Sequence, residues 1–184
     1  AHDAVRLASG LCTLLALEFI LLAARELHGK DFAATAPLIL AGSLGFLYHA
    51  HEAQPMLAAL TAHTAAYWAL ILLPRRPQIA TPVFGVAAGI AFLANGILPV
   101  LALIPAVLLT LFFSCNRQRD ALSLAASTAL AGGLGGAWIL AVHLVAPEIL
   151  QGFWVKELAS LNSTLSTAHN LARHLNLLLW YAWP

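Results

Sequence analysis

The fold is decided by residues 77–116, PQIATPVFGVAAGIAFLANGILPVLALIPAVLLTLFFSCN, which contain no Asp, Glu, Lys or Arg. A helix that crosses a membrane needs about 20 mainly apolar residues, so this stretch is long enough for two such helices. The pair Asn95-Gly96 predicts a tight turn between them. Open strands are excluded because they would leave backbone polar groups unpaired in lipid. We therefore predict two membrane-spanning helices here.

The whole chain shares this composition. Of its 184 residues, 61% are hydrophobic and 9% are charged, whereas a soluble domain carries roughly 25% charged residues. Residues 121–147 form a second run without charge. The net charge is +1, and no basic patch could neutralise nucleic-acid phosphates, so no nucleic-acid partner is expected. We predict an all-α, polytopic transmembrane helix bundle: a single domain over residues 1–184 and a piece of a longer membrane protein.

The apolar segments predict about six to seven spans. Residues 147–184 are expected to form an interfacial segment followed, near residue 170, by the start of a further helix. The six expected spans are 5–25, 33–49, 55–73, 79–95, 97–114 and 122–145.

Basic residues predict the orientation of these spans. Six of the nine Lys and Arg residues fall in loops on one side of the predicted bundle, and an excess of positive charge marks the cytoplasmic side. Asn95-Gly96 and the segment from Pro147 then lie on the outer side. The sequence thus predicts a multi-pass protein of the inner (plasma) membrane whose active face is periplasmic. The six residues are Arg25, Lys30, Arg75, Arg76, Arg117 and Arg119.

Glu52 is the one charged residue between Phe32 and Pro74, and it lies in the stretch YHAHEAQPML, residues 48–57. In one interpretation its carboxylate faces the N-terminus of a helix that begins near Pro55. In the other, it forms a ligand site at the membrane boundary with neighbouring polar residues. Glu52 and His51 would then bind Mg²⁺ or Mn²⁺, which could hold a phosphate. The candidate substrate-binding neighbours are His49, His51 and Gln54.

The segment after Pro147 combines cations with tryptophans. Lys156, Arg173 and His174 could attract the phosphate of a lipid carrier. Trp154 and Trp180 suit the aromatic belt at the level of the lipid head groups. The alternative is a helix that only lies on the bilayer and contacts membrane lipids.

Polar residues inside the predicted spans support two other functions. Glu18 is expected to face the bundle interior, and with His63 and His143 it could form the polar pathway of a transporter or channel subunit. The two histidines could instead ligate haem in a redox subunit. His63 is the only histidine on its helix, so we expect neutral, hydrogen-bonded histidines and no haem. The stretch AGGLGG, residues 131–136, is interpreted as a surface for close helix packing.

Three stretches resemble the membrane domain of GT-C glycosyltransferases, namely the dolichyl-phosphate-mannose-protein mannosyltransferase-like proteins that include the lipid A aminoarabinose transferases. These stretches are HEAQPMLAALTAHTAAYWALILLPRRP (51–77), GVAAGIAFLANGILPVLALIPAVLL (85–109) and ARHLNLLLWYAWP (172–184). The resemblance covers roughly residues 6–184. It implies a partial GT-C fold.

The resemblance also implies a reaction. A sugar would pass, with inversion, from a polyprenyl-phosphate donor to a lipid, glycan or protein acceptor on the outer face. An acidic residue would act as general base near a divalent cation, and Glu52 matches such an acidic position. Two departures are evident: Asn95, a candidate substrate-binding residue, stands where the family commonly has lysine, and the family's first outer loop, with its catalytic aspartate, is not among these residues. We therefore expect no catalysis from these 184 residues alone.

Overall fold

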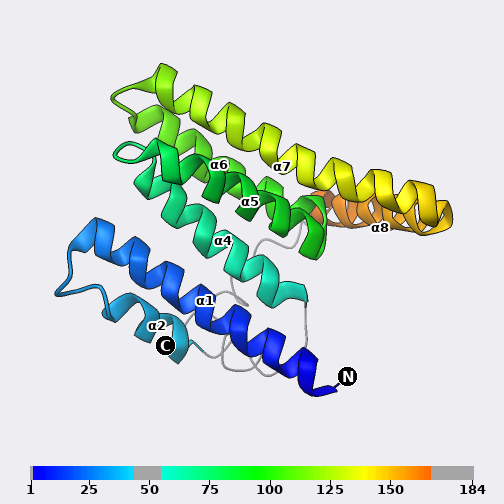
Figure 1. The fold of residues 1–184 in the computed structure, drawn as a ribbon, viewed down its shortest axis with the longest axis horizontal. Coiled ribbons are helices and arrows are strands. Elements are labelled where there is room, and N and C mark those ends of the chain that lie inside the picture. The colour runs from blue at the N-terminus through cyan, green and yellow to red at the C-terminus, as the bar shows by residue number, and fades with distance from the viewer. Residues whose placement is uncertain (1, 44–54, 167–184) are drawn as a thin grey trace.

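The computed structural model describes residues 2–43 and 55–166, and within them every regular element is an α-helix (Figure 1). This confirms the predicted all-helical membrane bundle. The helices are α1 (His2–His28), α2 (Thr35–Gly42), α4 (Pro55–Leu72), α5 (Pro77–Asn95), α6 (Ile97–Phe113), α7 (Arg117–Val145) and α8 (Pro147–Ser166).

Four of these helices contain segments long and apolar enough to cross a membrane: Leu7–His28, Pro55–Leu72, Pro77–Asn95 and Arg117–Val145. Helix α6 is apolar but has 17 residues. Helix α2 covers eight residues of the predicted span 33–49, and the last six positions of that span lie outside the described residues. The further helix predicted near residue 170 also falls outside them.

Prolines and glycines set the helix boundaries. Pro55, Pro77 and Pro147 each occupy the first position of a helix, where the missing N–H would have had no intrahelical acceptor. Gly96 separates α5 from α6 with φ of 75°, a backbone conformation that side chains disfavour. The turn predicted at Asn95-Gly96 is thus confirmed.

Two pairs of parallel helices organise the bundle. Contacts between α1 and α4 join residues 49 positions apart: the Thr61 hydroxyl donates to the Cys12 carbonyl, Phe19 packs on Trp68, and Arg75 pairs with Glu26. Helices α5 and α7 are parallel in the same way, and the Ser127 hydroxyl donates to the Thr81 carbonyl at 2.8 Å. Helix α5 packs extensively against α4, and so connects the two pairs (Figure 1).

The core consists largely of alanine, while many large apolar residues face outward. Ala65, Ala66 and Ala69 of α4 are buried against Ala80 and Ala87 of α5. Small side chains let helix backbones approach closely, which drives association where lipid is as apolar as leucine. Exposed leucine, isoleucine and phenylalanine side chains on the outer surface suit contact with lipid tails.

The glycines that make the closest helix contact are not the ones expected. A Cβ at Gly85 would lie 2.8 Å from the Ser127 carbonyl oxygen, and one at Gly89 would lie 2.8 Å from the Leu134 side chain. Both glycines belong to α5. Of the AGGLGG stretch on α7, only Gly135 is packed tightly, against Phe92, whereas Gly132, Gly133 and Gly136 have open space where a Cβ would point. The predicted packing surface is therefore only partly formed by that stretch.

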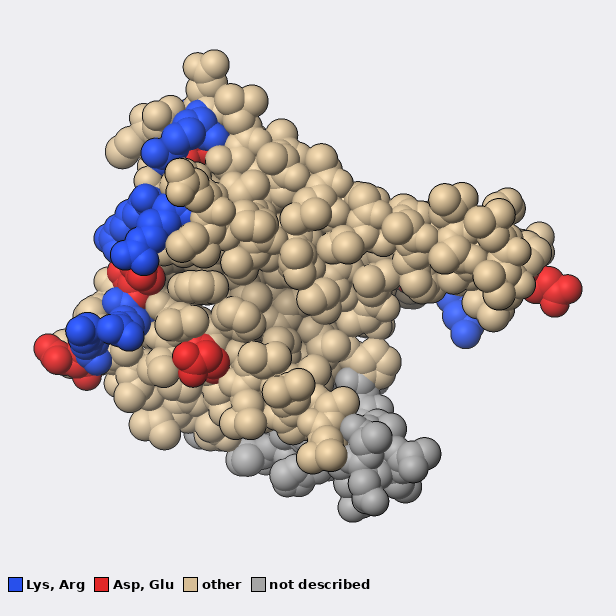
Figure 2. Space-filling view, in the orientation of Figure 1, with Lys and Arg blue, Asp and Glu red and all other residues tan. Residues whose placement is uncertain are grey.

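Charged side chains gather at one end of the bundle, which we call the basic end (Figure 2). It comprises the turns between α1 and α2, between α4 and α5, and between α6 and α7, with all six basic residues of the predicted loops. The Asp120 carboxylate, 1% exposed, accepts hydrogen bonds from the Ser114 hydroxyl at 2.6 Å and from Arg119. Arg119 also donates to the Pro74 carbonyl at 2.7 Å. These bonds hold two of the turns together.

Candidate functional site

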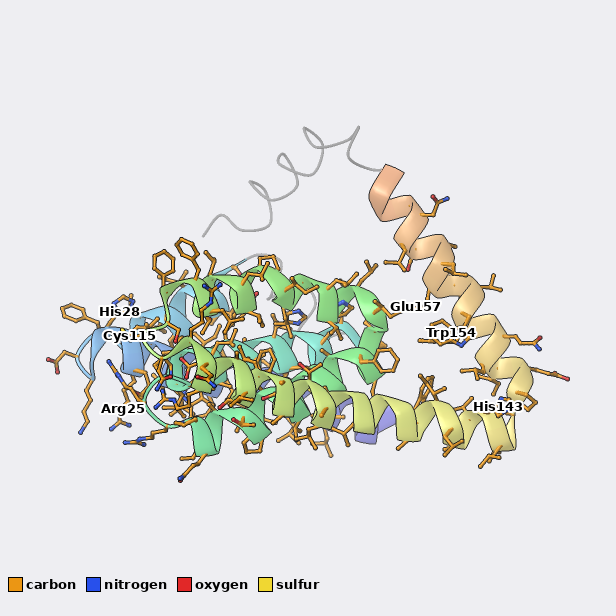
Figure 3. All side chains as sticks on the ribbon, turned by 90° about the horizontal axis from the view of Figure 1, so that it is seen from above. Arg25, His28, Cys115, His143, Trp154 and Glu157 are labelled. Carbon is orange, nitrogen blue, oxygen red and sulfur yellow. The ribbon has the colours of Figure 1, made fainter. Side chains whose placement is uncertain are left out.

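The opposite end of the bundle is formed by the α5–α6 turn, the end of α7 and helix α8. In Figure 3, α8 leaves the end of α7 near His143 and runs across this end, while Arg25, His28 and Cys115 lie at the basic end. Pro55, three residues after Glu52, begins α4 here as well. Two described residues with a predicted substrate-binding role, Asn95 and Lys156, lie at the opposite end.

The α5–α6 turn is held by a carboxylate from α8. The Gly96 amide donates to the Phe92 carbonyl at 2.8 Å and ends α5. The next amide, that of Ile97, donates to a Glu157 carboxylate oxygen at 3.0 Å. The first amides of a helix have no intrahelical acceptor and carry partial positive charge, so a carboxylate there is stabilising. Glu157 thus caps α6, although it lies 60 positions after Ile97 in the sequence.

A cluster of aromatic rings lies beside this cap. Phe153 of α8 contacts Trp138 of α7 with ring centroids 5.4 Å apart and Phe92 of α5 at 6.1 Å. Phe92 and Trp138 contact each other at 6.3 Å, and Trp154 packs on Phe153. All four contacts have edge-to-face geometry, the favoured arrangement for aromatic pairs. The cluster joins three helices at the opposite end.

The two predicted site residues at this end face solvent or lipid head groups. Asn95 is exposed at the end of α5, and Lys156 is exposed on α8. Their side chains are accessible to a ligand and are not brought into contact with each other by any recorded bond. The remaining predicted site residues lie outside the described part of the chain: Glu52, His49, His51, Gln54, Arg173 and His174. The proposed metal ligands, Glu52 and His51, thus remain a prediction.

The structure corrects the expectation that Glu18 faces the bundle interior, and it places His143 on the surface as well. Glu18 is exposed on α1, which packs mainly on α4 and α2 and leaves its other side open. His143 is exposed because α7 extends past the ends of α5 and α6 (Figure 1). Within the described residues these side chains form no continuous polar pathway with His63.

His63 is half-buried, unlike Glu18 and His143. Its Nδ1 lies 2.7 Å from the Ala59 carbonyl oxygen and its Nε2 lies 3.0 Å from the Pro99 carbonyl oxygen. Both ring nitrogens thus face backbone carbonyls, to one of which a neutral ring can donate its N–H, and the second contact joins α4 to α6. The arrangement matches the expected hydrogen-bonded histidine.

Glu157 and the aromatic cluster are features that the sequence reasoning missed. In the segment after Pro147 the sequence pointed to Lys156, Arg173 and His174 instead. A signal was present, because Phe153 and Glu157 are four positions apart and therefore lie on one face of a helix.

Comparison with known proteins identifies one family. The family model of the dolichyl-phosphate-mannose-protein mannosyltransferases matches residues 1–146. This match includes helices α1 to α7 and ends just before α8. No curated protein matches the chain, and no solved structure does so either.

Proposed function

Because this chain belongs to the dolichyl-phosphate-mannose-protein mannosyltransferase family, a group of membrane glycosyltransferases of the GT-C type, we propose that it takes part in sugar transfer from a polyprenyl-phosphate donor. The acceptor is a lipid, a glycan or a protein. The reaction takes place at the opposite end of the bundle, on the periplasmic face of the inner membrane. The observation that carries the proposal is the family match over residues 1–146.

The charge distribution supports the choice of face. The basic end holds the arginine-bearing turns, and an excess of Lys and Arg in short loops marks the cytoplasmic side of a membrane protein. The opposite end, which holds Asn95, Lys156 and the start of α4, is then extracytoplasmic. Aromatic residues such as Trp138 and Trp154 suit its position at the head-group level.

An apolar groove supports a donor linked to a lipid. A groove of about 430 Å³ lies between α1, α4 and α5, and its lining includes Phe19, Val83, Val86 and Ile90. The Thr61 hydroxyl, which also lines it, already donates to backbone carbonyls. A lining of this kind excludes polar ligands and suits the hydrocarbon chain of a polyprenyl carrier.

The chemistry assigned to Glu52 is that of a general base. It would accept the proton of the acceptor nucleophile as that nucleophile attacks the sugar carbon, and the donor phosphate would leave with inversion at that carbon. A Mg²⁺ or Mn²⁺ ion held by Glu52 and His51 would offset the charge on the phosphate. His49, Gln54, Asn95, Lys156, Arg173 and His174 are proposed contacts of the donor head group.

Substitution of Glu52 in the full-length protein tests this proposal. Glu52→Gln keeps the size of the side chain and removes the base, so the rate of sugar transfer should fall by roughly 10²–10⁴-fold. The measurement is transfer of labelled sugar from a polyprenyl-phosphate donor by membranes that contain equal amounts of each variant. Glu148→Gln, an exposed carboxylate on α8, is the matched control and should keep its activity. Normal transfer by Glu52→Gln would limit this carboxylate to a role at the helix end.

A further inference from the structure

Helix α8 has one face turned toward the bundle. Its half-buried residues are spaced as on one side of a helix, whereas Trp154, Val155, Lys156 and Leu158 between them are exposed. The inward residues are Leu150, Phe153, Glu157, Ser160 and Leu161. Glu157 is therefore the one ionisable residue on the inward face of this helix.

A carboxylate on such a face is costly unless it has a partner. The partner of Glu157 is the N-terminus of α6, where the Ile97 amide donates to it at 3.0 Å. Pro99, at the third position of α6, has no N–H, so few amides at this helix end need an acceptor. The Glu157 carboxylate satisfies one of them, that of Ile97.

Gly96 has no side chain in the space that the Glu157 carboxyl group occupies. A Cβ built on Gly96 would overlap the Glu157 carboxyl group, so any side chain there would push Glu157 away. Together with Phe153 one turn earlier, the bond fixes α8 at two points on its inward face. The outward face, with Lys156, is thereby held in one orientation at the opposite end.

We propose that Glu157 is a positioning residue for sugar transfer: by capping α6 it fastens α8 across the end of the bundle and holds Lys156 where the donor phosphate binds. This inference rests on the proposed function, because the positioned residue serves the donor. Glu157 itself does not touch the donor. The bond to Ile97 and the collision with any side chain at position 96 carry the inference.

The test uses the full-length protein in lipid nanodiscs with two readouts. The first is hydrogen–deuterium exchange of residues 147–163, which reports whether α8 is docked. The second is the KM for a polyprenyl-phosphate sugar. Glu157→Ala should speed exchange of α8 about tenfold and raise KM about tenfold with a smaller change in kcat, because docking must then be recovered on binding.

Three further variants sharpen the result. Glu157→Gln keeps an oxygen that accepts from the Ile97 amide, so it should restore much of the docking and of the KM. Gly96→Ala should loosen α8 as Glu157→Ala does, through the collision and through the strain of a side chain at φ of 75°. The double variant Gly96→Ala/Glu157→Ala keeps the strain but lacks the collision, so it should be less severe than the sum of the two. Gln151→Ala, on the exposed face of α8, is the control and should change neither readout.

The outcomes separate the two proposals. Unchanged exchange in Glu157→Ala would show that the bond does not dock α8. Faster exchange with an unchanged KM would show a purely structural role and would overturn the positioning proposal. Absence of any transfer by the wild type with a polyprenyl-phosphate sugar would overturn the proposed function instead, while the exchange data would still decide whether Glu157 docks α8.

Discussion

At the residue scale, several polar side chains of the described helices are paired with backbone carbonyls, whereas the Thr13 hydroxyl and the Trp68 indole N–H are buried without a partner. The hydroxyls of Thr61, Thr64, Thr110 and Thr128 each donate to a carbonyl one turn earlier in their own helix. Such bonds let a polar residue enter an apolar helix at little cost. Asp120 is the buried charged residue of the described part of the chain, and its carboxylate accepts hydrogen bonds from the Ser114 hydroxyl and the Arg119 guanidinium.

Asp120→Ala should therefore destabilise the fold. It leaves Arg119 and the Ser114 hydroxyl without their acceptor and loosens the contact of Arg119 with the Pro74 carbonyl. Hydrogen bonds to charged groups contribute about 1.5–3 kcal/mol, and the half-exposed arginine places the expected loss near the lower value. Thermal unfolding in detergent measures it. Asp31→Ala, an exposed aspartate at the same end, is the matched control, and an equal loss in both variants would argue against the Asp120 contacts.

At the scale of elements, close contact of small residues joins the parallel pair α1–α4 to the parallel pair α5–α7. Helix α5 contributes most, because Gly85 and Gly89 let Leu130 and Leu134 of α7 approach its backbone. Dispersion contacts of this kind hold membrane helices together where burial from water does not act.

Gly85→Val should separate α5 from α7. Its side chain would collide with the Ser127 carbonyl and with Leu130, and overpacking of this kind costs about 1–3 kcal/mol. We expect a lower midpoint of thermal unfolding in detergent. The control is Gly132→Val on α7, where the corresponding space is open. Equal midpoints for Gly85→Val and the wild type would mean that the two helices do not depend on this contact.

The groove between α1, α4 and α5 provides the second test at this scale. Val86→Trp should fill part of it and weaken binding of the hydrocarbon chain. A chain displaced from the groove passes into lipid and loses its dispersion contacts with the groove wall, so the KM should rise for long-chain carriers. Short-chain donors should be affected less. Ile104→Trp, on the exposed side of α6, controls for the added bulk. The same KM change for long and short donors would exclude the groove as the chain site.

At the scale of the whole molecule, charge divides the bundle into two ends. Arg75 pairs with Glu26 and Arg119 with Asp120, yet the basic end keeps an excess of cations (Figure 2). The opposite end carries Glu148, Lys156 and Glu157 beside the aromatic cluster. Orientation in the membrane follows from this asymmetry.

A natural cysteine can report the orientation. Cys115 is exposed in the turn between α6 and α7 at the basic end. A membrane-impermeant maleimide should label it in inside-out vesicles and leave it unlabelled when applied from outside the plasma membrane. Cys115→Ser should remove the signal, and Gln151→Cys in that background should be labelled from outside. Labelling of Cys115 from outside would reverse the orientation and place the proposed reaction on the cytoplasmic face.

The sequence by itself determined the class of fold, most helix boundaries and the separation of basic turns from the opposite end. These features follow from local properties: runs of apolar residues, prolines at helix starts, glycine at the Asn95-Gly96 turn and charge in loops. The family named from the resemblance is the one that matches residues 1–146, and two of the three stretches lie within that match, whereas residues 172–184 lie beyond it.

Only the tertiary structure decided which polar residues meet. Glu157 and Ile97 are 60 positions apart, and no local pattern shows that α8 turns back over the end of α6. Likewise, Glu18 lies among apolar residues in the sequence, but its exposure depends on which side of α1 faces α4. Local sequence sets the period and ends of each helix, whereas the packing of small residues between helices sets their rotation, and rotation decides which side chains come together.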